Sequence, residues 1–140
     1  MDLHPVIVHF PVALLSLYSV LEIIRFKNIQ TKSLLVVLGT LGSYAAYITG
    51  LINKNSIVGE IPPALNWHQI FATITLVIFT IISIYYLTRS KKEWLPPFLL
   101  VILAILGLAF ITLTGALGGS LVYGPDTDPF VKFIYSILPL

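Results

Sequence analysis

The sequence contains no cysteine and very few charged residues. Charged side chains make up only 10% of its 140 residues, with 8 Lys and Arg against 6 Asp and Glu. The absence of cysteine excludes disulfide bonds, thiolate metal sites and haem attached through a CxxCH motif. Soluble domains carry about a quarter charged residues. The low charge, together with a hydrophobic content of 57%, therefore indicates an integral membrane protein.

Four apolar runs are each long enough to cross a bilayer, which takes about 20 residues. They cover approximately residues 5–24, 33–52, 67–87 and 97–123. We predict an all-α fold, a four-helix transmembrane bundle that forms a single domain of residues 1–140. Residues 124–140 are too few to cross again, so we expect this tail to lie in the outer membrane interface or to pack on the bundle. Asp2 stands where a signal peptide would be basic, so we expect the first run to be a retained helix.

Basic residues are concentrated in the first and third loops. They are Arg25, Lys27, Lys32, Arg89, Lys91 and Lys92. Positive loops face the cytoplasm, so both termini are expected on the extracytoplasmic side. This topology accounts for the positive charge without any nucleic-acid role. We also expect Glu22 to pair with Arg25 at i+3, Asn66 to cap the third helix, and Pro97 to begin the fourth.

All histidines of the sequence fall at the predicted outer rim. They are His4, His9 and His68. His9 shares a helical face with Ser16 and Ser19, which predicts that it points into the bundle, because polar groups avoid lipid. His68 is predicted to point inward on the same grounds. His4 lies about 140° from His9 around a regular helix, so the two cannot easily bind one ligand unless Pro11 distorts the helix.

The second and fourth runs are rich in glycine. The residues concerned are Gly39, Gly42, Gly50, Gly107, Gly115, Gly118 and Gly119. Small residues leave room for a planar macrocycle between helices, or else allow the helices to pack closely against each other. The sequence leaves both interpretations open.

We predict one b-type haem whose iron is bound by His9 and His68, one neutral imidazole from each of two facing helices. Lys54, Trp67 and Tyr123 are candidate partners for the haem propionates, and Gly50 and Gly119 are candidates for the space beside the ring. His4 is expected at the rim, within reach of a propionate or of a ligand histidine. Alternatives are a three-histidine copper or zinc site, or a cofactor-free structural or assembly subunit whose histidines only make hydrogen bonds. No residues point to catalysis.

The opening of the chain resembles a known family. His4-Pro5, Val8-His9-Phe10-Pro11 and Ala13-Leu14 resemble the HPxxVHFPxAL opening of the bacterial membrane family named domain of unknown function 2231. Thr49-Gly50, His68 and the run from Gly119 to Tyr123 match later signatures of that family in the same order. The resemblance covers most of the chain.

This family is grouped with four-helix b-type cytochromes, and its members can accompany or be fused to c-type cytochromes. The resemblance implies haem binding and electron transfer in a bacterial cytoplasmic (inner) membrane, as a small subunit of a larger respiratory or redox complex. A c-type cytochrome or a quinone is the implied redox partner. Members often continue after the tyrosine with a histidine and a glycine, whereas Tyr123 precedes Gly124-Pro125-Asp126. The histidine that a second haem would use is thus missing here, so we expect one haem, held by His9 and His68.

Overall fold

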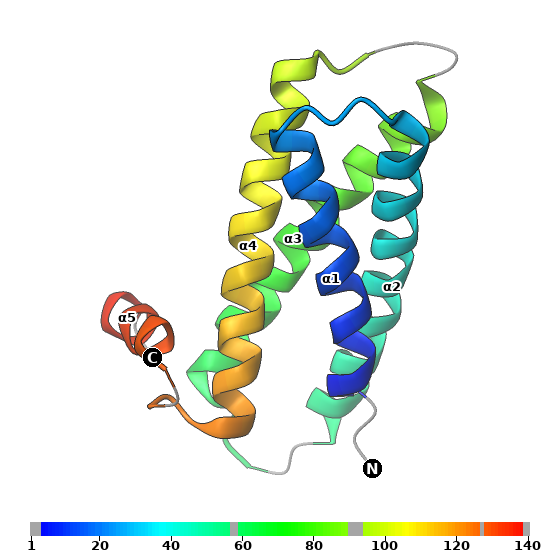
Figure 1. Ribbon diagram of the computed structural model, residues 1–140. Helices are drawn as coiled ribbons and strands as arrows, with labels where there is room; N and C mark the ends of the chain where they lie inside the picture. The colour runs from blue at the N-terminus through cyan, green and yellow to red at the C-terminus, as the bar shows by residue number, and fades with distance from the viewer. Residues whose placement is uncertain (1–3, 57–58, 90–93, 127, 139–140) are drawn as a thin grey trace.

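The computed structural model describes residues 4–56, 59–89, 94–126 and 128–138, and all of their regular elements are helices (Figure 1). The helices are α1 (His4–Ile23), α2 (Ile29–Asn55), α3 (Pro63–Thr88), α4 (Pro97–Tyr123) and α5 (Pro129–Ile137). The first four are long and apolar enough to cross a membrane. The predicted all-α fold with four candidate spans is confirmed.

Prolines and an asparagine determine where the helices begin. The Asn28 side chain accepts a hydrogen bond from Thr31 N at 3.0 Å and caps α2. Pro63 and Pro97 are the first residues of α3 and α4, where a missing N–H costs nothing. The prediction for Pro97 is confirmed. The prediction that Asn66 caps the third helix is wrong, because Pro63 already begins it one turn earlier.

A short turn joins α1 to α2. Phe26 N donates to Leu21 O at 2.8 Å and Arg25 N to Glu22 O at 3.0 Å. These bonds form a Schellman motif, and Arg25 takes its left-handed position with φ of 57°. The turn returns the chain directly, so α1 and α2 are antiparallel neighbours.

The bundle consists of two hairpins. α1 packs along α2 and α3 along α4, and the hairpins then meet through α1 with α4 and α2 with α3. The helices therefore follow one another around the bundle in chain order, and α1 lies diagonally opposite α3 (Figure 1). We call the end where α1 and α3 begin the histidine end, because it carries His4 and His68.

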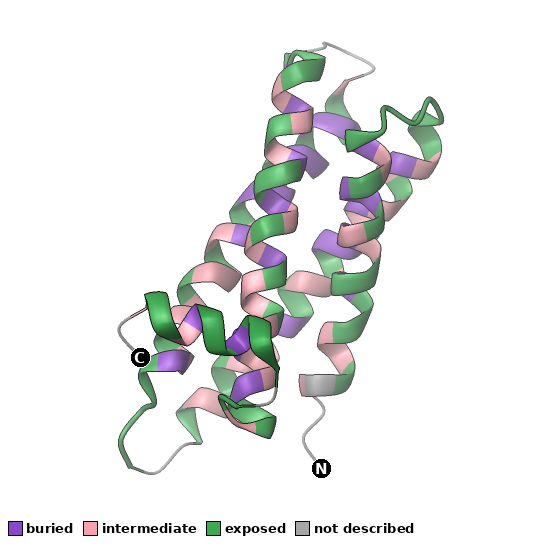
Figure 2. Cartoon of the chain, turned by 60° about the vertical axis from the view of Figure 1, so that its left-hand side comes forward, coloured by how far each residue is buried: buried purple, intermediate pink, exposed green. Residues whose placement is uncertain are grey.

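The large buried side chains are concentrated away from the histidine end. The hydrophobic core cluster consists of Leu15, Tyr18, Val36, Ile78, Phe79, Ile82, Tyr85, Tyr86, Leu95, Leu100, Ala104 and Ile111. They come from the second half of α1 and α3 and, with Ile111 just past the middle, from the first half of α2 and α4, except Leu95, which precedes α4. Figure 2 shows buried residues on the sides of the helices that face the bundle interior. The core thus stabilises one half of the bundle.

A buried ion pair lies at the far end of this core. Lys32 Nζ is 3.0 Å from Glu22 Oε2, and Tyr86 Oη donates to the same oxygen at 2.7 Å. Glu22 and Lys32 are only 5% and 8% exposed. Glu22 therefore pairs with Lys32 of α2 and not, as predicted, with Arg25, which lies exposed in the turn beyond the helix. Lys32 is likewise a buried helix residue and not a loop residue.

The short helix α5 packs on the histidine end of α4. Asp128 caps it by accepting hydrogen bonds from Phe130 N and Val131 N. Val131 is buried, and Tyr135 Oη lies 3.1 Å from Ser120 Oγ of α4. For residues 128–138, the expected packing of the tail on the bundle is confirmed, whereas its position in the membrane interface stays a prediction.

We expect Lys32→Met to lower the free energy of unfolding by about 3 kcal/mol, because the Glu22 carboxylate would stay buried without its cation. Titration with a denaturing detergent, followed by circular dichroism, measures the change. The double variant Glu22→Leu/Lys32→Met removes both charges and should recover most of the loss. A loss below about 1 kcal/mol for Lys32→Met would show that the ion pair does not stabilise the bundle.

Candidate functional site

The inward face of α1 includes His4 and excludes His9. Pro11, Leu15, Tyr18 and Glu22 are buried at heptad spacing, and the same spacing leads back to His4, which is half-buried. His9 lies off this stripe and is exposed.

The structure therefore differs from the prediction that His9 points inward with the serines. Ser19 is buried, but Ser16 is only half-buried. Ser19 lies about 80° around the helix from His9, so a buried Ser19 does not bring His9 inside. His68 is half-buried on α3 and lies on the same side as the buried Thr75, which agrees with the prediction that His68 points inward.

His4 is held against the second helix of its own hairpin. Its Nδ1 lies 2.9 Å from Thr49 Oγ1. The Thr49 hydroxyl donates its one hydrogen to Ala46 O at 2.9 Å, so it accepts from the imidazole, and Nδ1 carries the proton. A Cβ added to Gly50 would lie 3.1 Å from His4 Cε1, so the absence of a side chain at Gly50 lets the ring approach α2.

His68 is held in the same way against α4. Its Nδ1 lies 2.8 Å from Thr114 O, and a carbonyl oxygen can only accept, so Nδ1–H donates. A Cβ added to Gly118 would lie 3.1 Å from His68 Cε1. The two hairpins thus repeat one arrangement, in which a histidine of the first helix lies against a glycine of the second and donates from Nδ1 to a threonine oxygen.

This arrangement brings two similar imidazoles together at the histidine end. His4 is near enough to His68 for the charges of the two rings to interact. In the neutral form, a proton on Nδ1 leaves the lone pair on Nε2, the nitrogen that can bind a metal. Within the described residues, no group of three or more His, Asp or Glu side chains is placed to hold a metal ion. His4 and His68, which share one environment, are thus the candidate ligands at this end.

The glycines divide between the two predicted roles. Gly39, Gly42 and Gly107 are covered by Leu15, Phe10 and Phe79 respectively, which is close helix packing. Gly50 and Gly118 lie against the histidines. A Cβ added to Gly115 or Gly119 would meet no atom within 4 Å, so these positions border open space.

The predicted rim residues lie at different distances from the histidines. Lys54 Nζ donates to Gln69 Oε1, which places its charge beside the turn of α3 that carries His68. The Trp67 ring is half-buried and lies 5.7 Å from the Phe71 ring. Tyr123 is 78% exposed, and no described contact joins it to His4 or His68. Lys54 and Trp67 therefore remain candidates for the site, whereas Tyr123 lies outside it.

One further residue has a buried hydroxyl without a hydrogen-bond partner among the described residues, and the sequence did not indicate this. Thr75 is 5% exposed and its Oγ1 has no hydrogen-bond partner among the described residues. It lies two turns deeper than His68 on the same face of α3. An unpaired buried hydroxyl costs about 1–3 kcal/mol, so a bound group or a water between His68 and the core would give it a partner.

The comparisons with known proteins identify a family but no characterised relative. A family model described as "Predicted membrane protein (DUF2231)" matches residues 1–127. Searches of curated proteins and of solved structures gave no match. The resemblance seen in the opening motif is thereby confirmed.

We expect the neutral rings of His4 and His68 to carry their protons on Nδ1, because each Nδ1 faces an oxygen that accepts. Nitrogen NMR of isotope-labelled histidine, in protein reconstituted into lipid nanodiscs, distinguishes the two tautomers. Thr49→Val should shift the His4 resonances alone, and Thr112→Val, on the exposed side of α4, should shift neither histidine. Neutral rings protonated at Nε2 would contradict the assignment.

Proposed function

The chain belongs to the DUF2231 family of predicted membrane proteins, and from that premise we propose that it binds one b-type haem and transfers electrons. His4 of α1 and His68 of α3 are the proposed axial ligands. The observation that carries the proposal is the repeated arrangement, in which each imidazole donates from Nδ1 to an oxygen of the neighbouring helix. Metal-binding histidines in proteins almost always make such a bond.

The donor set suits a haem iron. The neutral imidazoles of His4 and His68 would hold a haem iron through Nε2, and a bound haem would supply one-electron transfer. Thr49 Oγ1 and Thr114 O fix the ring orientations and make the imidazoles more basic. These bonds therefore prepare both rings before any ligand arrives.

The surroundings also suit a large planar group. None of the core cluster residues belongs to the turns that carry His4, Thr49, His68 or Gly118. Gly115 and Gly119 border open space, and the hydroxyl of Thr75 has no partner among the described residues. Lys54 places a positive charge at the rim, where it can pair with a propionate. These features support a cofactor in the half of the bundle that the core does not fill.

His4 replaces His9 in this proposal because His9 is exposed on the outside of α1. The same exposure argues against a copper or zinc site built from all three histidines.

The cellular setting is part of the proposal. Of the six basic residues predicted on the cytoplasmic side, Arg25, Lys27, Lys32 and Arg89 lie in or next to the turns at the end opposite the histidines, and Lys91 and Lys92 lie outside the described residues. This distribution supports an inner-membrane protein with both termini outside the cytoplasm. Few residues lie outside the helices, so electrons would pass to another membrane subunit, a c-type cytochrome or a quinone.

A single introduced cysteine tests the orientation, because the native chain has none. A cysteine at Glu60, on the proposed extracytoplasmic side, should react with an impermeant maleimide in intact cells. Failure to react contradicts this orientation.

Histidine substitutions test the proposal directly. We expect His4→Ala and His68→Ala each to abolish the low-spin b-type spectrum, because each removes one axial ligand. His9→Ala is the matched control and should leave the spectrum unchanged. Visible spectra of purified variants, with haem quantified per chain, give the readout.

Misfolding of an alanine variant is separated from ligand loss by His68→Met, which still offers a ligand. It should retain haem at a higher reduction potential, as histidine–methionine ligation does. Loss of haem in His9→Ala with retention in His4→Ala would assign the ligand to His9 and refute the proposed pair.

A further inference from the structure

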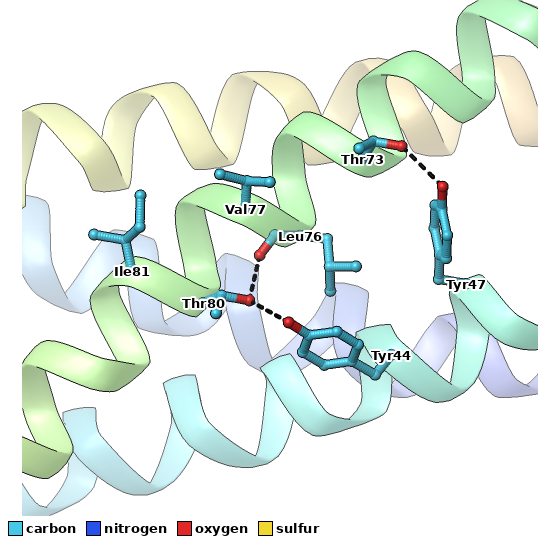
Figure 3. Close-up of a pocket in the computed structure, with 7 residues that line it drawn as sticks. All are labelled: Tyr44, Tyr47, Thr73, Leu76, Val77, Thr80 and Ile81. Carbon is cyan, nitrogen blue, oxygen red and sulfur yellow. Dashed lines mark hydrogen bonds between the residues drawn. The ribbon is translucent and has the colours of Figure 1, made fainter.

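A groove between α2 and α3 opens on the outside of the bundle at mid-span. Its volume is about 250 Å³, and its apolar floor includes Leu76, Val77 and Ile81. Two tyrosines of α2 reach across it to threonines of α3 (Figure 3). Tyr44 Oη lies 3.0 Å from Thr80 Oγ1, and Tyr47 Oη lies 3.1 Å from Thr73 Oγ1. Hydroxyl groups are unusual on a surface that faces lipid, and they call for an explanation.

The direction of these hydrogen bonds follows from their neighbours. Thr80 Oγ1 donates its only hydrogen to Leu76 O at 2.7 Å, and Thr73 Oγ1 donates to Gln69 O at 2.8 Å. Each threonine therefore accepts from its tyrosine, which uses the single hydrogen of each phenol. The phenol oxygens keep lone pairs, so a ligand that pairs with them must be a hydrogen-bond donor.

The spacing of the hydroxyls restricts the shape of that ligand. Thr73 and Thr80 are seven residues apart, about 10.5 Å along the helix axis, and the groove residues between them, Leu76 and Val77, are apolar. The phenol oxygens bonded to these threonines therefore lie toward opposite ends of the groove. A flat ring with a hydroxyl at each of two opposite edges offers one hydrogen-bond donor to each end. The groove is smaller than the ~300–1,000 Å³ of drug-sized sites, which also favours one small ring.

The surroundings restrict how the ligand arrives. Tyr44 is 43% and Val77 53% exposed, on helices that could cross a membrane, so entry is from the hydrocarbon. A second hollow of about 370 Å³, lined by Asn66, Gln69, Ile70 and Thr73, meets the groove at Thr73. It leads toward the turn of α3 that carries His68. A ligand that pairs with both phenols from the lipid side would therefore be soluble in lipid and carry two hydroxyl donors on a flat ring.

We propose that this groove binds a lipid-soluble quinol, with its two hydroxyls donating to Tyr44 Oη and Tyr47 Oη. The quinone form has carbonyl oxygens, which only accept, so it binds only by breaking the tyrosine–threonine bonds. The groove thus selects the reduced form. As a binding site it stands on the groove geometry alone, whereas its connection with a haem rests on the proposed function.

Equilibrium dialysis between protein-loaded and empty nanodiscs, without oxygen, tests the selectivity. The probes are decylubiquinol, decylubiquinone and the dimethyl ether of the quinol, which keeps the ring but has no donor. We expect the quinol to bind at least about tenfold more tightly than the other two, from two hydrogen bonds. Equal or tighter binding of the quinone, or of the ether, would overturn the proposal.

Variants locate the site. Tyr44→Phe and Tyr47→Phe should each weaken quinol binding about fivefold, because each removes one phenol oxygen that accepts from the ligand. Tyr135→Phe, which removes a phenol that bonds to Ser120 on α4, is the matched control and should bind like the parent. Unchanged quinol affinity in both groove variants refutes the site. A stable dimer that binds no quinol also refutes it, because a second copy of the chain would then cover the groove.

The dialysis does not depend on haem. The His4→Ala/His68→Ala protein should bind quinol as the parent does, so an absence of haem in the parent leaves the groove result intact. Loss of quinol binding in that protein would contradict a site that stands on α2 and α3 alone.

Discussion

In the hydrocarbon of a bilayer, a polar group without a partner inside the protein costs several kcal/mol, because no water is present to replace that partner. The helices of this chain meet that constraint in pairs. Glu22 and Lys32 neutralise each other between α1 and α2, and Thr40 Oγ1 lies 2.8 Å from Ser83 Oγ between α2 and α3. The imidazoles of His4 and His68 donate to oxygens of the helices beside them. Each bond also fixes the orientation of a side chain, so the pairing that stabilises the bundle also positions its chemical groups.

The bundle divides these tasks between its two ends. Around the ion pair, large side chains fill the interior and glycines serve close packing, as where Phe79 covers Gly107. At the histidine end, the glycines lie against imidazoles or border open space, and the hydroxyl of Thr75 has no partner among the described residues. A well-packed half that holds the helices together allows the other half to accommodate a ligand. This division is why we place a cofactor at the histidine end.

Composition and proline positions predicted the fold well, whereas the side-chain pairings required the structure. The long apolar runs, with Glu22 as their one charged residue, indicated four helices that could cross a membrane, and Pro97 begins its helix as expected. The orientation of His9 was predicted from Ser16 and Ser19, but small hydroxyl residues bond to their own helix, as Ser19 Oγ does to Leu15 O, and so indicate no shared face. The heptad spacing of the buried residues Pro11, Leu15, Tyr18 and Glu22 was the better guide, and it leads to His4. The Glu22–Lys32 pair joins two helices, so spacing within one helix could not reveal it. The opening motif, together with the later matches at Thr49-Gly50, His68 and Gly119 to Tyr123, led correctly to the family.

The most direct test of this account is a haem determination on the purified wild-type protein, expressed with haem available and reconstituted in lipid. The account predicts a reduced-minus-oxidised spectrum with a sharp b-type α-band and a pyridine haemochrome value of about one haem per chain, as expected for two axial imidazoles. A folded protein without a Soret band would contradict it. The paired imidazoles would then serve to hold each hairpin together, and the chain would be a structural subunit.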